Sequence, residues 1–229
     1  MDLMSIIDMV RQALGPIFIA GLQVTIPLTI VSFILALIIA GITAVSRISN
    51  SRILRFVFAT YVWIFRGTPL IVQLFIAYFG LASLGLTLDA WTAAVITFGL
   101  NSGAYASEAI RAAILSISNG QWDAARSLGM SRLKILQRII APQAFRIALP
   151  PLFNELISLV KGTSLAASIT LVEMFLVSQR VAARTYQPLI MYIVVAFFYL
   201  MISTILVGIQ SYLEKKNNKT CRRQYTCLV

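Results

Sequence analysis

Long apolar segments constrain the fold of this chain more than any other feature of its sequence. A hydrocarbon core of about 30 Å is crossed by roughly 20 apolar helical residues, because backbone polar groups in lipid must be paired within the segment. Of the 229 residues, 59% are hydrophobic and 12% are charged, about half the charged fraction of a soluble protein. We therefore predict an all-α, polytopic membrane protein with a single domain over residues 1–229. Five stretches are long enough to span: residues 17–45, 53–84, 91–115, 145–175 and 188–212.

The positions of the cations predict how these segments are oriented. The net charge is +11, and the cations collect in residues 47–55, in the polar stretch 118–142 and in the tail 215–229. Cytoplasmic loops of membrane proteins are enriched in Lys and Arg, which explains this charge without a nucleic-acid partner. With five spans, we expect the N-terminus outside and the C-terminus in the cytoplasm. We also expect residues 1–15 to form an interfacial helix and the basic tail to be disordered beside anionic lipid.

The polar stretch 118–142 separates the third and fourth apolar segments and carries helix signals of its own. Residues 121–128 follow a turn signal and predict a short helix. Gly129 stands where the end of a helix favours a left-handed residue. Ser131 can cap a second helix, which is expected to end near Pro142. Two short helices at a bend favour a docking element over a simple linker.

The third apolar segment carries polar side chains on one helical face. Asn101, Tyr105 and Glu108 recur at i, i+4 and i+7. An ionisable residue costs about 2.5–3.5 kcal/mol at mid-helix, so Glu108 is expected to meet a partner or a watery cavity. The alternative for Glu108 is an interface position beside Arg111. A neighbouring stripe of small residues predicts close contact with another helix: Gly99, Gly103 and Ser107.

Polar motifs interrupt two of the other apolar segments. Arg66-Gly67-Thr68-Pro69 lies within the second, while Pro150-Pro151 and Lys161-Gly162-Thr163-Ser164 are expected to break the fourth. Such breaks are tolerated where protein or water satisfies the freed backbone groups, and they point to a permeation pathway. Glu155 lies six residues before Lys161, on a different helical face, so we expect both to find partners on other helices.

Several kinds of chemistry have no residues to support them in this sequence. The chain has no His, and its two Cys residues, Cys221 and Cys227, both lie in the tail. No phosphate-binding loop, catalytic triad or metal-ligand cluster is present. We therefore expect no enzymatic activity, no catalytic residue, no metal site and no cofactor in this chain. If transport runs on ATP, another subunit must bind the nucleotide and Mg²⁺.

The polar stretch resembles the EAA loop of ABC importer permeases. The matching pattern is Asp123-Ala124-Ala125, three residues, Gly129, nine residues, Ile139, one residue and Ala141-Pro142. Asp123 stands for the usual Glu and Ala141 for the usual Leu, and both changes are conservative. In that family the loop is a cytoplasmic coupling helix that enters a groove on the ATP-hydrolysing subunit. The small Ala124 and Ala125 would let such a partner approach closely. An ordinary amphipathic loop is the alternative.

Further motifs widen the resemblance to permeases of polar amino acid uptake systems. They are Phe65-Arg66-Gly67-Thr68-Pro69, Asn101-Ser102-Gly103-Ala104-Tyr105 with Glu108 and Arg111, Gly120-Gln121-Trp122-Asp123-Ala124-Ala125, Leu149-Pro150-Pro151 with Asn154-Glu155, and Lys161-Gly162-Thr163-Ser164-Leu165. Their order along the chain makes the match specific, whereas no single motif would.

The resemblance implies a type I importer in the bacterial cytoplasmic (inner) membrane. Its parts would be two five-helix permease subunits (a homo- or heterodimer), two cytoplasmic ATPases and an extracytoplasmic amino-acid-binding protein. The residues expected to contact the ATPase are Gln121, Trp122, Asp123, Ala124, Ala125 and Gly129. Those expected to line or brace the substrate route are Arg66, Thr68, Asn101, Ser102, Tyr105, Glu108, Lys161, Thr163 and Ser164. The alternative is a secondary transporter of a small polar solute, with Glu108 or Glu155 as proton carrier, although the inverted repeats usual in such folds are not visible.

Overall fold

Helices form the whole regular structure of the described chain. The computed structural model describes the backbone of residues 3–226 and the side chains of residues 7–216. It contains α1 (Leu3–Ala20), η1 (Gly21–Thr25), α2 (Ile26–Arg47), α3 (Arg52–Gly67), α4 (Leu70–Phe75), η2 (Ile76–Gly80), α5 (Leu81–Ser83), α6 (Ala90–Leu115), α7 (Asn119–Ser127), α8 (Arg132–Ile135), η3 (Leu136–Ile140), α9 (Ala141–Gly162), η4 (Thr163–Ile169), α10 (Met174–Thr185) and α11 (Pro188–Thr226). These residues include no strand, and the predicted all-α class is confirmed.

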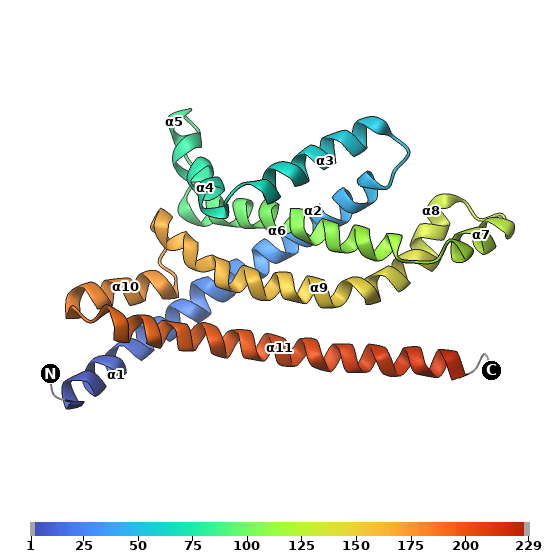
Figure 1. The fold of residues 1–229 in the computed structure, drawn as a ribbon. Coiled ribbons are helices and arrows are strands. Elements are labelled where there is room, and N and C mark those ends of the chain that lie inside the picture. Colours follow the sequence, from blue (N-terminus) through green and yellow to red (C-terminus); the bar gives the residue numbers. More distant parts are fainter. Residues whose placement is uncertain (1–2, 227–229) are drawn as a thin grey trace.

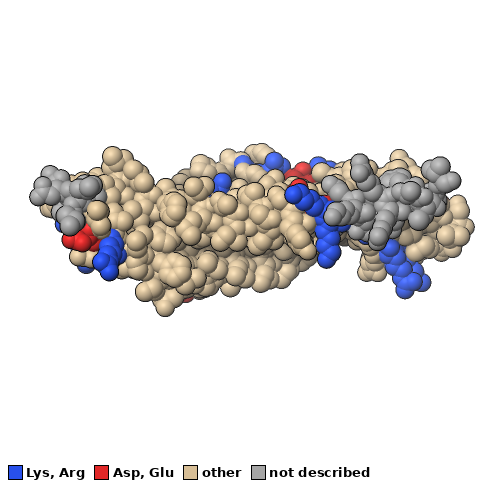
Figure 2. All heavy atoms as spheres, turned by 90° about the horizontal axis from the view of Figure 1, so that it is seen from below, with Lys and Arg blue, Asp and Glu red and all other residues tan. Residues whose placement is uncertain are grey.

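The long helices run along the length of the molecule. Figure 1 shows the N-terminus and α10 at one end, and α7, α8 and the C-terminal end of α11 at the other. In Figure 2 one face carries almost no charged side chain along its middle, and Lys and Arg gather toward the two ends. An apolar band between charged ends is the surface that a bilayer requires.

The predicted number of five spans is not confirmed. Among the described residues, two helices are long and apolar enough to cross a membrane, Ile7–Arg47 and Pro188–Lys216. Two bent pairs raise the number to four if each is one span, and the pair Arg52–Gly67 and Leu70–Ser83 bends by 106° at the Thr68-Pro69 break. α6 is not among the candidates, because its small and polar residues lower its hydropathy, although it packs against α2 and α9.

Prolines do not end helices where the sequence predicted that they would. The predicted interfacial helix over residues 1–15 is continuous with the first span, since α1, η1 and α2 follow each other without a gap. Likewise α8, η3 and α9 continue through Pro142, where we expected a helix end. A short π-helix precedes both Pro27 and Pro142, and its wider turn moves the carbonyl four residues back away from the proline ring.

Two further boundaries differ from the prediction. α9 passes through Pro150 and Pro151 without a break, as neighbouring helices often permit in membrane proteins. The change of geometry comes later, where η4 begins at Thr163. The tail expected to be disordered from residue 215 continues as helix to Thr226, because no Pro or Gly follows Gly208 to end the helix. The side chains of residues 217–229, including Cys221 and Cys227, lie outside the described part.

The small-residue stripe of α6 packs against α2, which confirms the predicted close contact with another helix. A Cβ atom on Gly99 would lie 2.6 Å from Cδ2 of Leu35, and one on Gly103 would lie 3.0 Å from Cγ2 of Ile39. Glycine therefore lets the two backbones approach closely.

The α6 N-terminus is fixed by Asp89, which accepts hydrogen bonds from the Thr92 backbone N–H at 3.0 Å and the Thr92 hydroxyl at 2.6 Å. These two bonds also lower the pKa of the Asp89 carboxyl.

Candidate functional site

α7 ends in the left-handed turn that the sequence predicted. Gly129 has a φ of 72°, a conformation in which a Cβ atom is unfavourable. The Met130 N–H donates to the Ala125 carbonyl at 3.2 Å and the Gly129 N–H to the Arg126 carbonyl at 2.8 Å. These bonds satisfy carbonyls at the end of the helix and set the direction in which the chain enters α8.

The inner face of α7 is anchored in the body of the protein. Ala125 is only 2% exposed and belongs to a core cluster with residues of α2, α6 and α9, against which Trp122 also packs. The expectation that Ala125 contacts another protein is therefore wrong for this structure. Ala125 is small because Ile117 and Ile135 occupy the same cluster, which leaves little room for a larger side chain.

The outer face of α7 is open. Gln121, Asp123 and Ala124 are exposed, and Asp123 forms an ion pair with Arg126 at 3.1 Å in which both side chains are more than 60% exposed. Leu128, which sequence reasoning passed over, is 79% exposed. An apolar side chain that stands in solvent beside a helix end is a candidate contact for a partner.

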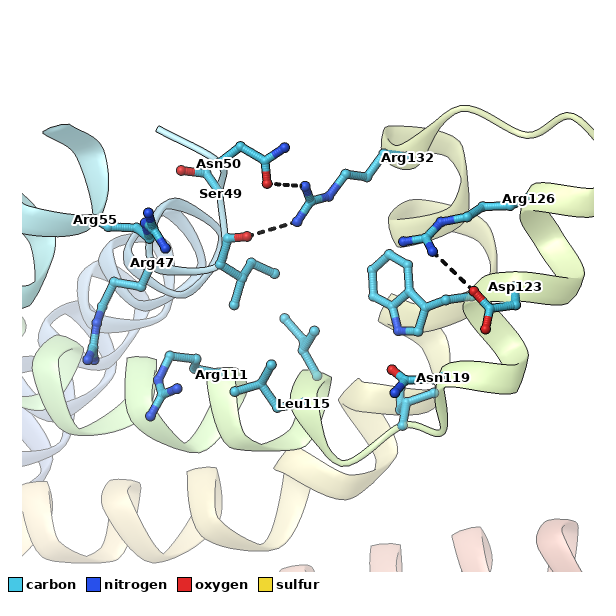
Figure 3. A pocket seen from close by; sticks show the side chains of 14 residues that line it. Arg47, Ser49, Asn50, Arg55, Arg111, Leu115, Asn119, Asp123, Arg126 and Arg132 are labelled. Carbon is cyan, nitrogen blue, oxygen red and sulfur yellow. Dashed lines mark hydrogen bonds and ion pairs between the residues drawn. The ribbon is translucent and has the colours of Figure 1, made fainter. Parts of the chain in front are cut away.

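A cation-rich pocket lies between the turn that joins α2 to α3, the end of α6, and α7. Its volume is about 630 Å³, and five arginines line it together with the single carboxylate of Asp123: Arg47, Arg55, Arg111, Arg126 and Arg132. These arginines come from five different helices, and Figure 3 shows them around the pocket. Arg132 bridges its two sides by donating to the Asn50 side chain and, at 3.0 Å, to the Ile48 carbonyl. The segment that carries α7 and α8 is thereby held to the α2–α3 turn.

Asn101 braces the break between α3 and α4 rather than facing an open route. Its amide donates to the Phe65 carbonyl at 3.1 Å and to Oε1 of Gln73 at 3.0 Å. Gln73 in turn donates to the Phe65 carbonyl at 2.9 Å and to the Thr68 hydroxyl at 2.8 Å. The backbone carbonyl freed by the break is thus satisfied by side chains. The role of Gln73 was not predicted from the sequence, because a single amide side chain within an apolar segment forms no recognisable motif.

Glu108 gathers three cations from separate helices. It forms ion pairs with Arg47 of α2 and, at 3.0 Å, with Arg111 of its own helix, while Arg66 approaches to 4.0 Å. The Arg66 guanidinium also lies 5.1 Å from the centre of the Tyr105 ring, within the range of a cation–π interaction. The sequence predicted for Glu108 either a place beside Arg111 or a place at a cavity, and the structure shows both. Glu108 pairs with Arg111, and it lines a pocket of about 400 Å³ with Arg66 and Tyr105.

The remaining predicted route residues lie elsewhere. Lys161 and Ser164 line a second pocket of about 550 Å³ against α11, and the buried Thr163 donates to the Val160 carbonyl at 2.7 Å. Ser102 of α6 lies beside Glu155 of α9, so a polar residue on another helix is close to this acid, as expected. The nine residues predicted to line or brace the route therefore fall into separate groups, and the structure does not place them around one cavity.

Glu173 is a buried acid that sequence reasoning also missed. It is 0% exposed and caps α10 by accepting from the Phe175 and Leu176 N–H groups at 2.8 Å each, with the Tyr199 hydroxyl at 2.7 Å. Three hydrogen bonds satisfy its oxygens, which makes its role structural.

Comparison with known proteins identifies the family of this fold. Residues 32–219 match the model described as "Binding-protein-dependent transport system inner membrane component". The chain belongs to this family. It is a permease subunit of an ABC importer and not an enzyme, and nothing in the comparisons favours a transporter driven by an ion gradient.

Relatives and solved structures agree with this assignment. The chain is 50% identical over 210 residues to the L-cystine transport system permease protein TcyB of Bacillus subtilis, covering 91% of this chain and 90% of the relative. It is 39% identical to the arginine transport system permease protein ArgU of Corynebacterium glutamicum, over 88% and 68% of the two chains.

Among solved structures, an amino acid ABC transporter crystallised with histidines matches with a TM-score of 0.85 and 31% identity, over 94% of this chain and 99% of that one. The MetNI methionine ABC transporter matches with a TM-score of 0.69 at 17% identity, covering 95% and 99%, which shows the fold alone.

Proposed function

We propose that this permease carries a polar amino acid into the cell, and that L-cystine is the substrate to test first. The observation that carries the proposal is the 50% identity to an L-cystine permease, which extends over 91% of this chain and 90% of the relative. The similar arginine permease and the amino acid transporter structure support the wider class of polar amino acids.

The exposed face of α7 is proposed as the contact with the ATPase. Gln121, Asp123, Ala124 and Leu128 present this face, whereas Trp122 and Ala125 fix the opposite face to the core. The same core includes Ala113 of α6 and Ala148 of α9. A push on α7 is therefore passed to two long helices without an intervening flexible loop, which is how closure of an ATPase pair would reach the substrate route.

Arg66, Tyr105 and Glu108 are proposed to form the part of the route that meets the substrate. They share one pocket and offer both signs of charge, as a zwitterionic amino acid requires. Thr68 and Asn101 hold the helix break in place beside them. Ser102 lies beside Glu155. Lys161 and Ser164 are proposed to form a second wall of the route, which a second permease subunit closes. The buried Thr163 is proposed to brace this wall.

The complete importer is proposed to hold two permease subunits, two ATPases that bind ATP and Mg²⁺, and an extracytoplasmic binding protein. It would lie in the bacterial inner membrane, with the N-terminus outside and the C-terminus in the cytoplasm. Two observations support this orientation: the termini lie at opposite ends of the molecule (Figure 1), and the arginine-rich pocket lies at the end where α11 finishes.

Uptake by the purified importer tests the substrate. The permease, its ATPase and its binding protein are reconstituted in vesicles, and uptake of labelled L-cystine is measured with ATP inside. We expect uptake that needs ATP hydrolysis and is unaffected by ionophores, with arginine and glutamine as poor competitors. Equal competition by arginine would assign a broader specificity, and uptake that follows an ion gradient would contradict the proposal.

A further inference from the structure

We propose that the cation-rich pocket beside α7 binds the phosphate of an anionic phospholipid headgroup. Five guanidinium groups line it, and the nearby carboxylates are Asp123, which pairs with Arg126, and Glu108, which pairs with Arg47 and Arg111. Two carboxylates leave three of the five positive charges unmatched within the described residues. A phosphate group is the ligand that several guanidinium donors recognise best, since each offers paired N–H groups to its oxygens.

Two residues that line the same pocket have side-chain donors without a partner among the described residues. None of the described side chains forms a hydrogen bond or ion pair with Arg55, which lines the pocket from α3. The buried Ser49 hydroxyl, also in its wall, has no hydrogen-bond partner. Buried polar groups are nearly always paired, so the Ser49 hydroxyl lacks an acceptor that an anion could supply. The Arg55 side chain is exposed and free to bind the same anion.

The surroundings of the pocket favour a lipid over a free anion. A smaller pocket of about 360 Å³ shares Ile48, Asn50, Trp122 and Arg132 with it and continues it along the apolar side chains of Val45, Leu133 and Leu136. A cationic chamber that continues into an apolar one fits an amphipathic ligand with a charged head and an acyl chain. A free phosphate would leave the apolar half empty.

The depth of the pocket in the membrane agrees with this ligand. The first candidate span runs from Ile7 to Arg47, so Arg47 stands at the end of this long apolar helix. Basic pockets between membrane helices on the cytoplasmic side are typical sites for anionic headgroups. A lipid seated here would touch both the α2–α3 turn and α7. It would therefore stiffen the connection through which α7 moves the long helices.

Lipid retention by the purified complex tests the proposal without reference to transport. The permease with its ATPase is exchanged into detergent with equal amounts of phosphatidylglycerol and phosphatidylcholine, and bound lipid is measured by native mass spectrometry. We expect selective retention of phosphatidylglycerol, about fivefold weaker in Arg55→Gln, since each surface arginine contributes on that scale. Arg55→Lys should retain most of the lipid. Arg52→Gln, one helical turn away and outside the pocket, makes the same charge change and should bind as the wild type does.

The other possible occupants give different results. Inorganic phosphate is added first to the wild type with bound phosphatidylglycerol, and then to the wild type in phosphatidylcholine vesicles. If phosphate displaces the lipid and also raises ATP hydrolysis in these vesicles, the ligand is a free anion and the lipid assignment is overturned. If Arg55→Gln loses the ATPase during purification and retains lipid as the wild type does, the arginines bind the ATPase instead. If Arg52→Gln and Arg55→Gln both weaken phosphatidylglycerol retention equally, the lipid is held by the general positive charge of the surface and not by the pocket. Because retention is read without substrate, failure of the L-cystine assignment would leave this result untouched.

Discussion

At the scale of single residues, burial reassigns the small side chains of α7. Ala124 and Ala125 are adjacent and chemically identical, and both were predicted from the sequence to lie at a partner surface. Ala125 is 2% exposed within the core, whereas Ala124 is exposed. One alanine is small because the chain itself packs over it, and the other leaves space for a partner.

Enlarging these two alanines should therefore have different effects. Ala125→Leu overfills the core and should destabilise the permease by about 1–3 kcal/mol, seen as a lower melting temperature in detergent. Ala124→Leu should leave the melting temperature unchanged and reduce co-purification of the ATPase. A melting temperature lowered equally by both changes would contradict the assigned faces of α7.

Gly129 should be required for its backbone conformation and not for its size. Its φ is 72° and nothing lies within 4 Å of the position of a Cβ, so Gly129→Ala adds strain of about 1 kcal/mol without a clash. We expect weaker ATP hydrolysis stimulated by the binding protein, with normal insertion in the membrane. Asn tolerates the left-handed region, so Gly129→Asn should be close to wild type. Gly120→Ala is the matched control, because Gly120 also faces open space without a positive φ. Equal activity of Gly129→Ala and Gly120→Ala would remove the turn from the coupling mechanism.

At the scale of helices, the pair α2 and α6 forms the centre of the bundle. The contact is close because Gly99 and Gly103 face Leu35 and Ile39, and the Tyr61 hydroxyl donates to the Leu100 carbonyl at 2.5 Å beside them. Asn101 and Glu108 lie on the same helix and reach α3 and α2 respectively. α6 thus carries both the packing surface and the polar contacts.

Replacing Gly103 by Leu should separate α2 from α6. Its Cβ alone would lie 3.0 Å from Ile39 and 3.2 Å from the Tyr61 hydroxyl, and a helix interface has no space for three further carbons. We expect loss of folded permease in size-exclusion chromatography and loss of uptake. Gly41→Leu, where nothing lies within 4 Å, should give a normal elution profile. Normal uptake by Gly103→Leu would show that the stripe does not hold the bundle together.

At the scale of the whole molecule, charged residues gather toward both ends, while the face between the ends is almost entirely apolar (Figure 2). The pocket with Arg66, Tyr105 and Glu108 and the pocket beside α7 both involve Arg47. A change in the position of α7 therefore reaches the proposed substrate route through a single side chain of α2 as well as through the core.

Reactivity of single cysteines should follow this arrangement. In a background without Cys221 and Cys227, a cysteine at position 105 should react with a water-soluble thiol reagent in one nucleotide state, because Tyr105 is 40% exposed and lines a pocket. A cysteine at position 101 should stay protected, since Asn101 is 8% exposed and hydrogen-bonded to the break. Reaction at 101 and protection at 105 would reverse the roles assigned to these residues.

The sequence by itself determined those features that depend on local pattern. Apolar length and missing charge fixed the class of membrane protein, Gly129 marked a left-handed turn, and the stripe of Gly99, Gly103 and Ser107 marked a close helix contact. Each of these follows from a few adjacent or periodic residues and the backbone conformations they permit. The motifs also pointed to the family, because their order along the chain can be read without knowing which residues meet in the fold.

Only the tertiary structure decided which residues meet. Gln73 gained its role from Asn101, which lies 28 positions away, and Arg47 met Glu108 across two helices. Pro142 and Pro150 left their helices continuous because π turns and neighbouring helices compensate for a missing N–H. Ala125 is buried by helices from three other parts of the chain. Partners of this kind are set by long-range packing, which no pattern within one helix contains.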